Sequence, residues 1–228
     1  MNDTLAHWIS SLSKPGRPDE HEVKCLLETY GIPRPGGIRL EPDAPSDPGG
    51  LAAPYAVKVC SPDVPHKTEQ RAVLLRRTRE NVAEAVADLR NRFPGECVLI
   101  EEMVPFDGPE IIVGGLVDDV LGPALMVGAG GVMTELYKDA AFRLAPLNRD
   151  EAARMIGELV IAPVFSGFRG FTHDKDGLAR ICSAAGRLLA DFGGGCTQLD
   201  INPLVHAHGK GWYALDGLMT LDMARLPA

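Results

Sequence analysis

The chain has 228 residues, a formal net charge of −8 and a hydrophobic share of 45%, which is the composition of an ordinary globular protein with one large domain or two small ones. The negative charge gives no overall attraction for nucleic acid, and no apolar stretch approaches the ~20 residues that span a membrane. The 5 cysteines include no C-x-x-C motif, so they predict neither a disulfide framework nor a thiolate metal site, and each is expected to be a small core residue. The N-terminus lacks the pattern of a secretory signal, so we expect a reduced, cytoplasmic setting.

The first third of the sequence predicts a helix, a loop and three short strands. Residues 1–18 are polar and are expected to form a loose leader. Asp19 and Glu22 have capping-box spacing before a helix that ends near Gly31. Prolines and glycines over 42–54 predict a loop without a helix. Strands are expected at 55–60, 72–75 and 97–102, with a helix carrying Val82, Val86 and Leu89 before the last of them.

The remaining elements alternate between antiparallel strands and amphipathic helices. A strand pair is predicted at 110–117 and 124–127. Asn148 and Glu151 open a helix whose inward residues are expected to be Met155, Ile156, Leu159 and Val160. The most regular helical pattern runs from Leu178 to Phe192, and a hairpin is predicted at 197–206 and 212–216. Because short turns join most neighbouring strands, the sequence predicts an α+β fold with antiparallel sheets.

Lys58 lies within the otherwise apolar segment YAVKV and shares a strand face with Ala56. A lysine in this position can act as a point charge on a nucleotide phosphate. The alternative is a lysine that protects an edge strand from pairing with another chain, and the segment alone favours that alternative.

His66 ends a proline-stiffened loop, SPDVPHKTE, between two predicted strands. A neutral imidazole is a competent nucleophile near pH 7 and can carry a phosphoryl group. Lys67 and Thr68 are then positioned to hold phosphate oxygens. Most loop histidines have no chemical role, so a histidine without a function remains an open alternative to a phosphoryl carrier at this position.

Two further segments could bind a nucleotide and its metal. In VGAGGV, Gly130 and Gly131 could direct backbone N–H groups at an anion or simply form a turn. In LDINP, Asp200 and Asn202 project to one face of an extended segment. If the last hairpin is symmetric about Gly209, Asp216 lies opposite Asn202. Three oxygen ligands would then meet in an arrangement suited to Mg²⁺, although polar turn residues are an equal alternative.

Taken in order, six segments resemble the ATP-grasp subunit of ADP-forming acyl-CoA synthetases, relatives of succinyl-CoA synthetase. They are LLETYGIPRP, VKVCSPDVPHKTE, LIEEMVP, GPEIIVGG, GPALMVGAGGVMTELYKDAAFRLAPL and LDINPL. The resemblance implies an ATP-grasp fold in which two α+β lobes hold ATP in a cleft between antiparallel sheets. We expect the lobes to cover residues 19–104 and 105–228.

The resemblance also implies roles for particular residues. Lys58 is expected on the ATP phosphates and Glu110 near the ribose. Glu102, Met103 and Val104 are expected to form the adenine hinge, Asp200, Asn202 and Asp216 to bind Mg²⁺, and His66 to act as a second phosphoryl relay point. The family interconverts acyl-CoA, ADP and phosphate with acid, CoA and ATP. The chain contains no CoA-binding Rossmann region, so we expect a partner alpha subunit that carries the main phosphohistidine, and a hetero-oligomer.

Two departures from the family pattern keep alternatives open. The family usually places a glycine pair where this chain has Arg71 and Ala72, and a helix where residues 42–54 predict a loop. Losing the glycines limits how closely the backbone can approach phosphates. This departure favours a non-catalytic ATP-binding regulatory module as the alternative to a catalytic subunit. A stand-alone ATP-grasp ligase would need a thiol-accepting pocket of its own, which the sequence does not show.

Overall fold

The computed structural model describes residues 2–64, 67, 69–131, 139–170, 173–207 and 209–227. The chain forms two compact units. The large unit comprises Met1–Pro18, Glu22–Arg34 and Pro105–Ala228, and the small unit comprises Asp19–His21 and Pro35–Val104. Each unit has its own hydrophobic core, so the two cores that an ATP-grasp fold requires are both present.

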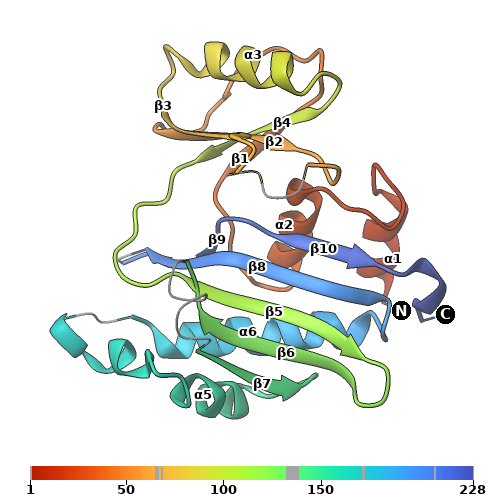
Figure 1. The fold of residues 1–228 in the computed structure, drawn as a ribbon, viewed down its shortest axis with the longest axis vertical. Helices are drawn as coiled ribbons and strands as arrows, with labels where there is room; N and C mark the ends of the chain where they lie inside the picture. The colour runs from red at the N-terminus through yellow and green to blue at the C-terminus, as the bar shows by residue number, and fades with distance from the viewer. Residues whose placement is uncertain are drawn as a thin grey trace. The chain divides into compact units, whose positions relative to one another are not determined.

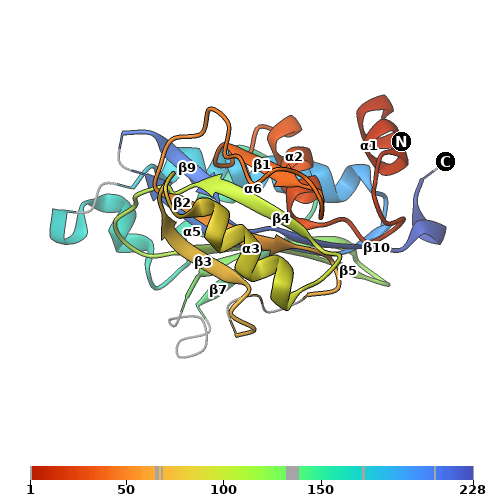
Figure 2. The same cartoon turned by 90° about the horizontal axis from the view of Figure 1, so that it is seen from above.

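The small unit is a four-stranded antiparallel sheet covered on one face by a helix. The strand order is β1-β4-β2-β3, with helix α3 over the strands (Figure 2). The core between them contains mainly valine, with some leucine and isoleucine, and the β-branched valine and isoleucine side chains pack well on a pleated surface. The elements are β1 (Gly37–Leu40), β2 (Tyr55–Cys60), β3 (Val73–Arg77), α3 (Val82–Arg92) and β4 (Cys97–Glu102).

The large unit is built on a six-stranded antiparallel sheet of order β10-β8-β5-β6-β7, with β9 paired to β8. Helices α5 and α6 lie behind the sheet in Figure 1. Its strands are β5 (Ile111–Asp118), β6 (Gly122–Ala129), β7 (Ala140–Leu144), β8 (Cys196–Ala207), β9 (Gly211–Ala214) and β10 (Leu218–Leu221). Its helices are α1 (Asp3–Ser10), α2 (Glu20–Thr29), α5 (Arg149–Gly157) and α6 (Lys175–Asp191), with single 3-10 turns at Ala162–Ser166, Phe168–Gly170 and Met223–Arg225.

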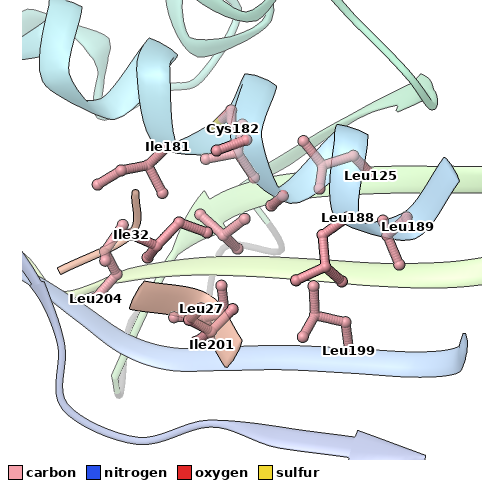
Figure 3. Packing of buried hydrophobic residues seen from close by; sticks show 14 of the residues in the cluster. Leu27, Ile32, Leu125, Ile181, Cys182, Leu188, Leu189, Leu199, Ile201 and Leu204 are labelled. Carbon is pink, nitrogen blue, oxygen red and sulfur yellow. The ribbon is translucent and has the colours of Figure 1, made fainter. Parts of the chain in front are cut away.

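Helix α6 supplies much of the large core. It begins where the Asp174 side chain accepts a hydrogen bond from the Gly177 N–H, and it ends before Gly193, whose φ is 56°. Its apolar residues recur every three or four positions and face the sheet. Figure 3 shows Leu188 and Leu189 directed toward Leu125 and Leu199. All the inward positions that the sequence predicted between Leu178 and Phe192 are buried.

The N-terminal segment differs from the expected loose leader. Asn2 caps helix α1 by accepting a hydrogen bond from the Leu5 N–H. Leu5 is fully buried and Trp8 nearly so, and the Trp8 ring packs edge-to-face on Phe192. A short apolar pair at helical spacing is therefore enough to anchor this segment in the large core. The two units divide between Val104 and Pro105, as expected, but Glu22–Arg34, which contains most of α2, belongs to the large unit rather than to the small one.

Several local predictions are confirmed and a few need correction. Strands 55–60 and 97–102, the loop over 42–54 and the Asn148 cap are present. The strand predicted at 72–75 runs from Val73 to Arg77, and β1, β7 and β10 were not predicted. Val160 was expected to face inward but is 75% exposed. Helix α5 ends at Gly157, so the helical periodicity no longer applies at Val160.

The structure agrees with the predicted role of the cysteines. Cys60, Cys97, Cys182 and Cys196 are buried, and all 5 cysteines are free. Burial raises the pKa of the Cys182 and Cys196 thiols to about 12 each, which keeps them protonated and unreactive near neutral pH. In the described part of the chain, no helix combines the length and apolarity that a membrane crossing requires.

Candidate functional site

Asp200, Asn202 and Asp216 are brought together by the register of the large sheet. The pairing of β8 with β9 is symmetric about Gly209, which is the condition under which the sequence places Asp216 opposite Asn202, and the same symmetry continues where Leu218 pairs with Asp200. Between these points the Leu215 N–H donates to the Pro203 carbonyl at 2.9 Å. The register therefore puts Asn202 opposite Asp216. Because side chains alternate along a strand, Asp200 and Asn202 share one face of the sheet.

The two carboxylates of this group influence one another. Burial, and then the charge of Asp216, raise the pKa of Asp200. The carboxylates are thus close enough to repel, and a divalent cation between them would offset that repulsion. The described residues contain no cluster of three His, Cys, Asp or Glu side chains placed to hold a metal. The available donors are two carboxylates and one amide oxygen, and this hard oxygen set fits Mg²⁺.

The predicted glycine pair contacts Glu110 directly. The Gly130 N–H donates to the Glu110 carbonyl at 2.7 Å. A Cβ atom on Gly130 would lie 2.9 Å from the Glu110 carbonyl carbon, and one on Gly131 would lie 2.9 Å from Glu110 Oε2. Gly131 also has a φ of +63°, which a residue with a side chain rarely adopts. Packing on Glu110 thus explains both glycines. The following Val132–Lys138, with Glu135, lie outside the described residues.

A hollow of about 290 Å³ opens on the face of the large sheet that carries Asp200. The shared face follows from the register, in which Asp200 pairs with Gly114, Gly114 with Met126, and Met126 with Phe142. Met126, Gly128 and Phe142 line the hollow. Glycine at 128 allows the Asp139 backbone to approach closely, because a Cβ there would lie 2.6 Å from the Asp139 carbonyl oxygen. The face therefore combines the acidic group with an apolar depression.

Lys58 lies between two carboxylates in the small unit. Its ammonium group is 2.7 Å from Glu20 Oε1 and 2.9 Å from Glu101 Oε2. The second oxygen of Glu20 lies 2.6 Å from the Lys67 ammonium group. The side chains of Glu20, Glu101 and Lys67 are all mostly buried, so their charges and that of Lys58 interact strongly. The structure thus joins two of the predicted phosphate ligands through one carboxylate.

The topology excludes the edge-strand explanation of Lys58. Strand β2 lies between β4 and β3 and has no open edge along its length. Sequence reasoning missed Glu20 and Glu101 as partners of this lysine. The signal was present for Glu101, since the paired apolar segments 55–60 and 97–102 each carry one inward charge, and the two have opposite sign.

The segment predicted as an adenine hinge is partly occupied by protein hydrogen bonds. The Glu102 N–H donates to the Gly36 carbonyl and the Met103 N–H to the Pro54 carbonyl, each at 2.9 Å. Glu102 Oε1 accepts a hydrogen bond from the Ala52 N–H at 2.7 Å. A base that binds to Glu102 or Met103 would therefore meet their carbonyl oxygens rather than their N–H groups.

The loop after β2 closes through Lys67 and Ala72, where the Ala72 N–H donates to the Lys67 carbonyl at 2.7 Å. Arg71 has a φ of 53°, the left-handed conformation that glycine adopts at no steric cost. The chain thus retains a glycine-like backbone at one of the two positions where the sequence departs from the family pattern. Ala72, the other position, is fully buried. His66 and Thr68, predicted as relay and phosphate ligand, lie outside the described residues.

Comparison with known proteins identifies the fold and its family. Residues 13–221 match the model of an ATP-grasp domain. The chain belongs to the ATP-grasp family. This ATP-grasp chain is 33% identical over 213 residues to the beta subunit of an ADP-forming acetate–CoA ligase I from Pyrococcus furiosus, covering 89% of the chain and 90% of that subunit. It is also 30% identical to the ADP-forming 4-hydroxybutyrate–CoA ligase of Nitrosopumilus maritimus, of whose length it covers 32%.

Solved structures support the same grouping of this ATP-grasp chain. The dinucleotide-forming acetyl-coenzyme A synthetase 1 of Candidatus Korarchaeum cryptofilum, in complex with CoA and Ca-AMPCP, superposes with a TM-score of 0.79 at 30% identity, covering 90% of this chain and 93% of that one. Another structure of that synthetase contains CoA and Mg-AMPPCP, with a phosphohistidine segment pointing towards the nucleotide-binding site, and has a TM-score of 0.74 at 31% identity over 89% and 92% of the two chains. The predicted fold and family are confirmed.

Proposed function

We propose that this ATP-grasp chain is the nucleotide-binding subunit of an ADP-forming acyl-CoA synthetase. In this proposal it transfers a phosphoryl group between ADP and a phosphohistidine on a CoA-binding partner, which carries out the acyl-CoA half of the reaction in a hetero-oligomer. The observation that carries the proposal is the register that sets Asp200, Asn202 and Asp216 together, in a chain that matches 90% of a beta subunit of such a ligase.

The residues have separate tasks in this proposal. Asp200, Asn202 and Asp216 would hold Mg²⁺, which supplies positive charge to the phosphate oxygens when it is bound. Lys58 would neutralise a further phosphate charge once it leaves one of its two carboxylate partners. Glu110 would contact the ribose, with Gly130 and Gly131 packed against it. The carbonyls of the Glu102–Val104 segment would accept a hydrogen bond from the amino group of the base.

His66 is the proposed relay. Its neutral imidazole attacks the phosphorus of the partner's phosphohistidine, so one N–P bond forms as the other breaks, and the proton that the His66 ring loses is balanced by the one that the released imidazole takes up. A terminal oxygen of ADP then attacks the same phosphorus, so the P–O bond of ATP forms as the N–P bond to His66 breaks, and the His66 ring takes up a proton to return to its free state. Splitting the transfer in two shortens each step, and Lys67 is the neighbouring cation for charge neutralisation.

A regulatory module without catalytic activity is the second candidate. Arg71 favours it, because a charged side chain stands where the family usually has glycine. The left-handed backbone at Arg71 argues against a regulatory module, because Arg71 adopts a backbone conformation that glycine would adopt readily. We therefore favour the catalytic subunit.

Calorimetry of the isolated chain with ADP, with and without Mg²⁺, tests the nucleotide half of the proposal. We expect Mg²⁺-dependent binding, and a gain of about 2.7 kcal/mol in the free energy of unfolding at a ligand concentration 100 times Kd. Absence of binding to Mg-ADP, Mg-ATP and Mg-GTP would overturn both candidates. Binding without phosphoryl transfer from the phosphorylated partner would favour the regulatory module.

A further inference from the structure

Lys24 is a fully buried lysine in the core of the large unit. It lies on α2, whose neighbouring inward residues Val23, Leu26 and Leu27 are apolar and equally buried. Placing an ammonium group in such surroundings costs several kcal/mol unless it is hydrogen-bonded and neutralised. Packing alone would be served better by methionine or leucine. The charge and donors of Lys24 therefore require an explanation.

The Lys24 ammonium group donates a hydrogen bond to the Leu215 carbonyl oxygen at 3.1 Å. Leu215 opens residues 215–217, the short break between the collinear strands β9 and β10 that we call the turn 215–217, and the next residue in it is Asp216. The turn also packs on α2 one residue further along, because a Cβ on Gly217 would lie 3.0 Å from Val23 Cγ1. Helix α2 therefore contacts the turn through both Val23 and Lys24.

The Asp216 side chain is oriented within that turn by its own backbone. Its Oδ1 accepts a hydrogen bond from the Gly217 N–H at 2.8 Å. On the other side of the turn, the Leu215 N–H is bonded to the Pro203 carbonyl. Leu215 is thus held by β8 through its N–H and by Lys24 through its carbonyl oxygen. Both peptide groups next to Asp216 are fixed by hydrogen bonds or close packing.

We infer that Lys24 is a positioning residue for the proposed metal site, holding the turn 215–217 so that the Asp216 carboxylate meets Asp200 and Asn202. The inference rests on the proposed function, since Asp216 is a metal ligand only there. It adds a residue that does not touch the metal itself but acts through the Leu215 backbone. Groups that orient metal ligands typically affect metal affinity by about 10- to 100-fold.

The experiment compares the affinity of the chain for ADP with and without Mg²⁺ in wild type and in Lys24→Met. We expect Lys24→Met to weaken Mg-ADP binding about tenfold, while binding of metal-free ADP stays unchanged. Leu26→Ala is the matched control, since it removes a buried side chain from the same helix and leaves the contacts of the turn in place. It should lower stability without changing the effect of Mg²⁺.

A second variant keeps the test independent of the buried charge. Gly217→Ala pushes the turn away from Val23 while keeping Lys24 and Asp216, and the same selective loss of Mg²⁺-dependent affinity is expected if Lys24→Met does not fold. The inference would be overturned, with the proposed function left standing, by either of two results. One is that Lys24→Met and Gly217→Ala bind Mg-ADP as tightly as the wild type, and the other is that Leu26→Ala loses as much affinity as they do. A wild-type chain that binds no Mg-ADP would overturn the proposed function together with it.

Discussion

The ammonium group of Lys58 and the carboxylate of Glu20 form an ion pair of 2.7 Å, with both side chains buried in the small unit. Removing one partner of a buried pair typically costs about 3–5 kcal/mol, and because Lys58 keeps Glu101 and Glu20 keeps Lys67, the lower end of that range applies. We therefore expect Lys58→Met and Glu20→Gln each to lower the free energy of unfolding by about that amount, and the double variant by less than their sum. Urea unfolding of the four proteins measures this. Asp88→Asn, which breaks an exposed pair with Arg92, should cost about 0.5 kcal/mol or less, and strictly additive losses would contradict the coupling.

Gly131→Ala tests whether the glycine pair serves the nucleotide site through Glu110. The new Cβ would lie 2.9 Å from Glu110 Oε2, so the carboxylate must move, and we expect weaker ADP binding by about tenfold, or 1.4 kcal/mol. Gly209→Ala is the control, because Gly209 has a similar φ of +70° and open space around it. Both variants carry backbone strain, and only the first displaces Glu110. Calorimetric titration with ADP compares them; equal affinities would remove Glu110 from the site.

Asp216→Ala tests the proposed metal set. Loss of one of its two carboxylates should weaken Mg-ADP binding at least about tenfold while the fold is kept, because the residue lies in a turn and not in the core. Asp222→Ala removes a carboxylate beyond β10 that caps a short turn, and it should leave Mg-ADP affinity unchanged. If Asp216→Ala binds Mg-ADP like the wild type, the turn interpretation of Asp216 replaces the metal one.

Asp200 predicts a pH dependence of stability without metal. Burial and then the charge of Asp216 raise its pKa in the folded chain, so the folded state binds this proton more tightly than the unfolded state. The stabilisation of the folded chain by the protonated Asp200 carboxyl is complete below the pKa of Asp200 in the unfolded chain. It is lost as the pH rises through the pKa of Asp200 in the folded chain. Asp200→Asn should therefore melt above the wild type at pH 7 in a chelator, with the difference shrinking in acid. A lower melting temperature for Asp200→Asn at pH 7 would show that Asp200 is net stabilising.

His66→Ala separates the relay from nucleotide binding. With the phosphorylated partner present, we expect ATP formation to be abolished and ADP affinity to stay unchanged, because the imidazole is needed only in the chemical step. Phosphate label that is acid-labile and base-stable should appear on this chain in the wild type and in His7→Ala, whose histidine is exposed on α1, but not in His66→Ala. Full labelling of His66→Ala would move the relay to another residue.

Much of the architecture could be predicted from the sequence because the relevant signals are local. The apolar runs of β2 and β4, the Asn148 cap and the periodicity of α6 can each be recognised within a short stretch of sequence. The hairpin around Gly209 also has a local register, and extending that register along the sequence pairs Asn202 with Asp216.

Tertiary structure decided the features that depend on distant residues. Strands β1, β7 and β10 are only 4 or 5 residues long and become strands through hydrogen bonds to partners elsewhere in the chain. The N-terminal helix is held by burial of Leu5 and Trp8. Two apolar residues in a polar segment did not indicate that the segment would be anchored in the core. Likewise, nothing local to Glu20 or Lys24 indicates that one binds Lys58 and the other the Leu215 carbonyl. Such contacts depend on which surfaces meet on folding, and a buried charge can be recognised as paired only when its partner is in place.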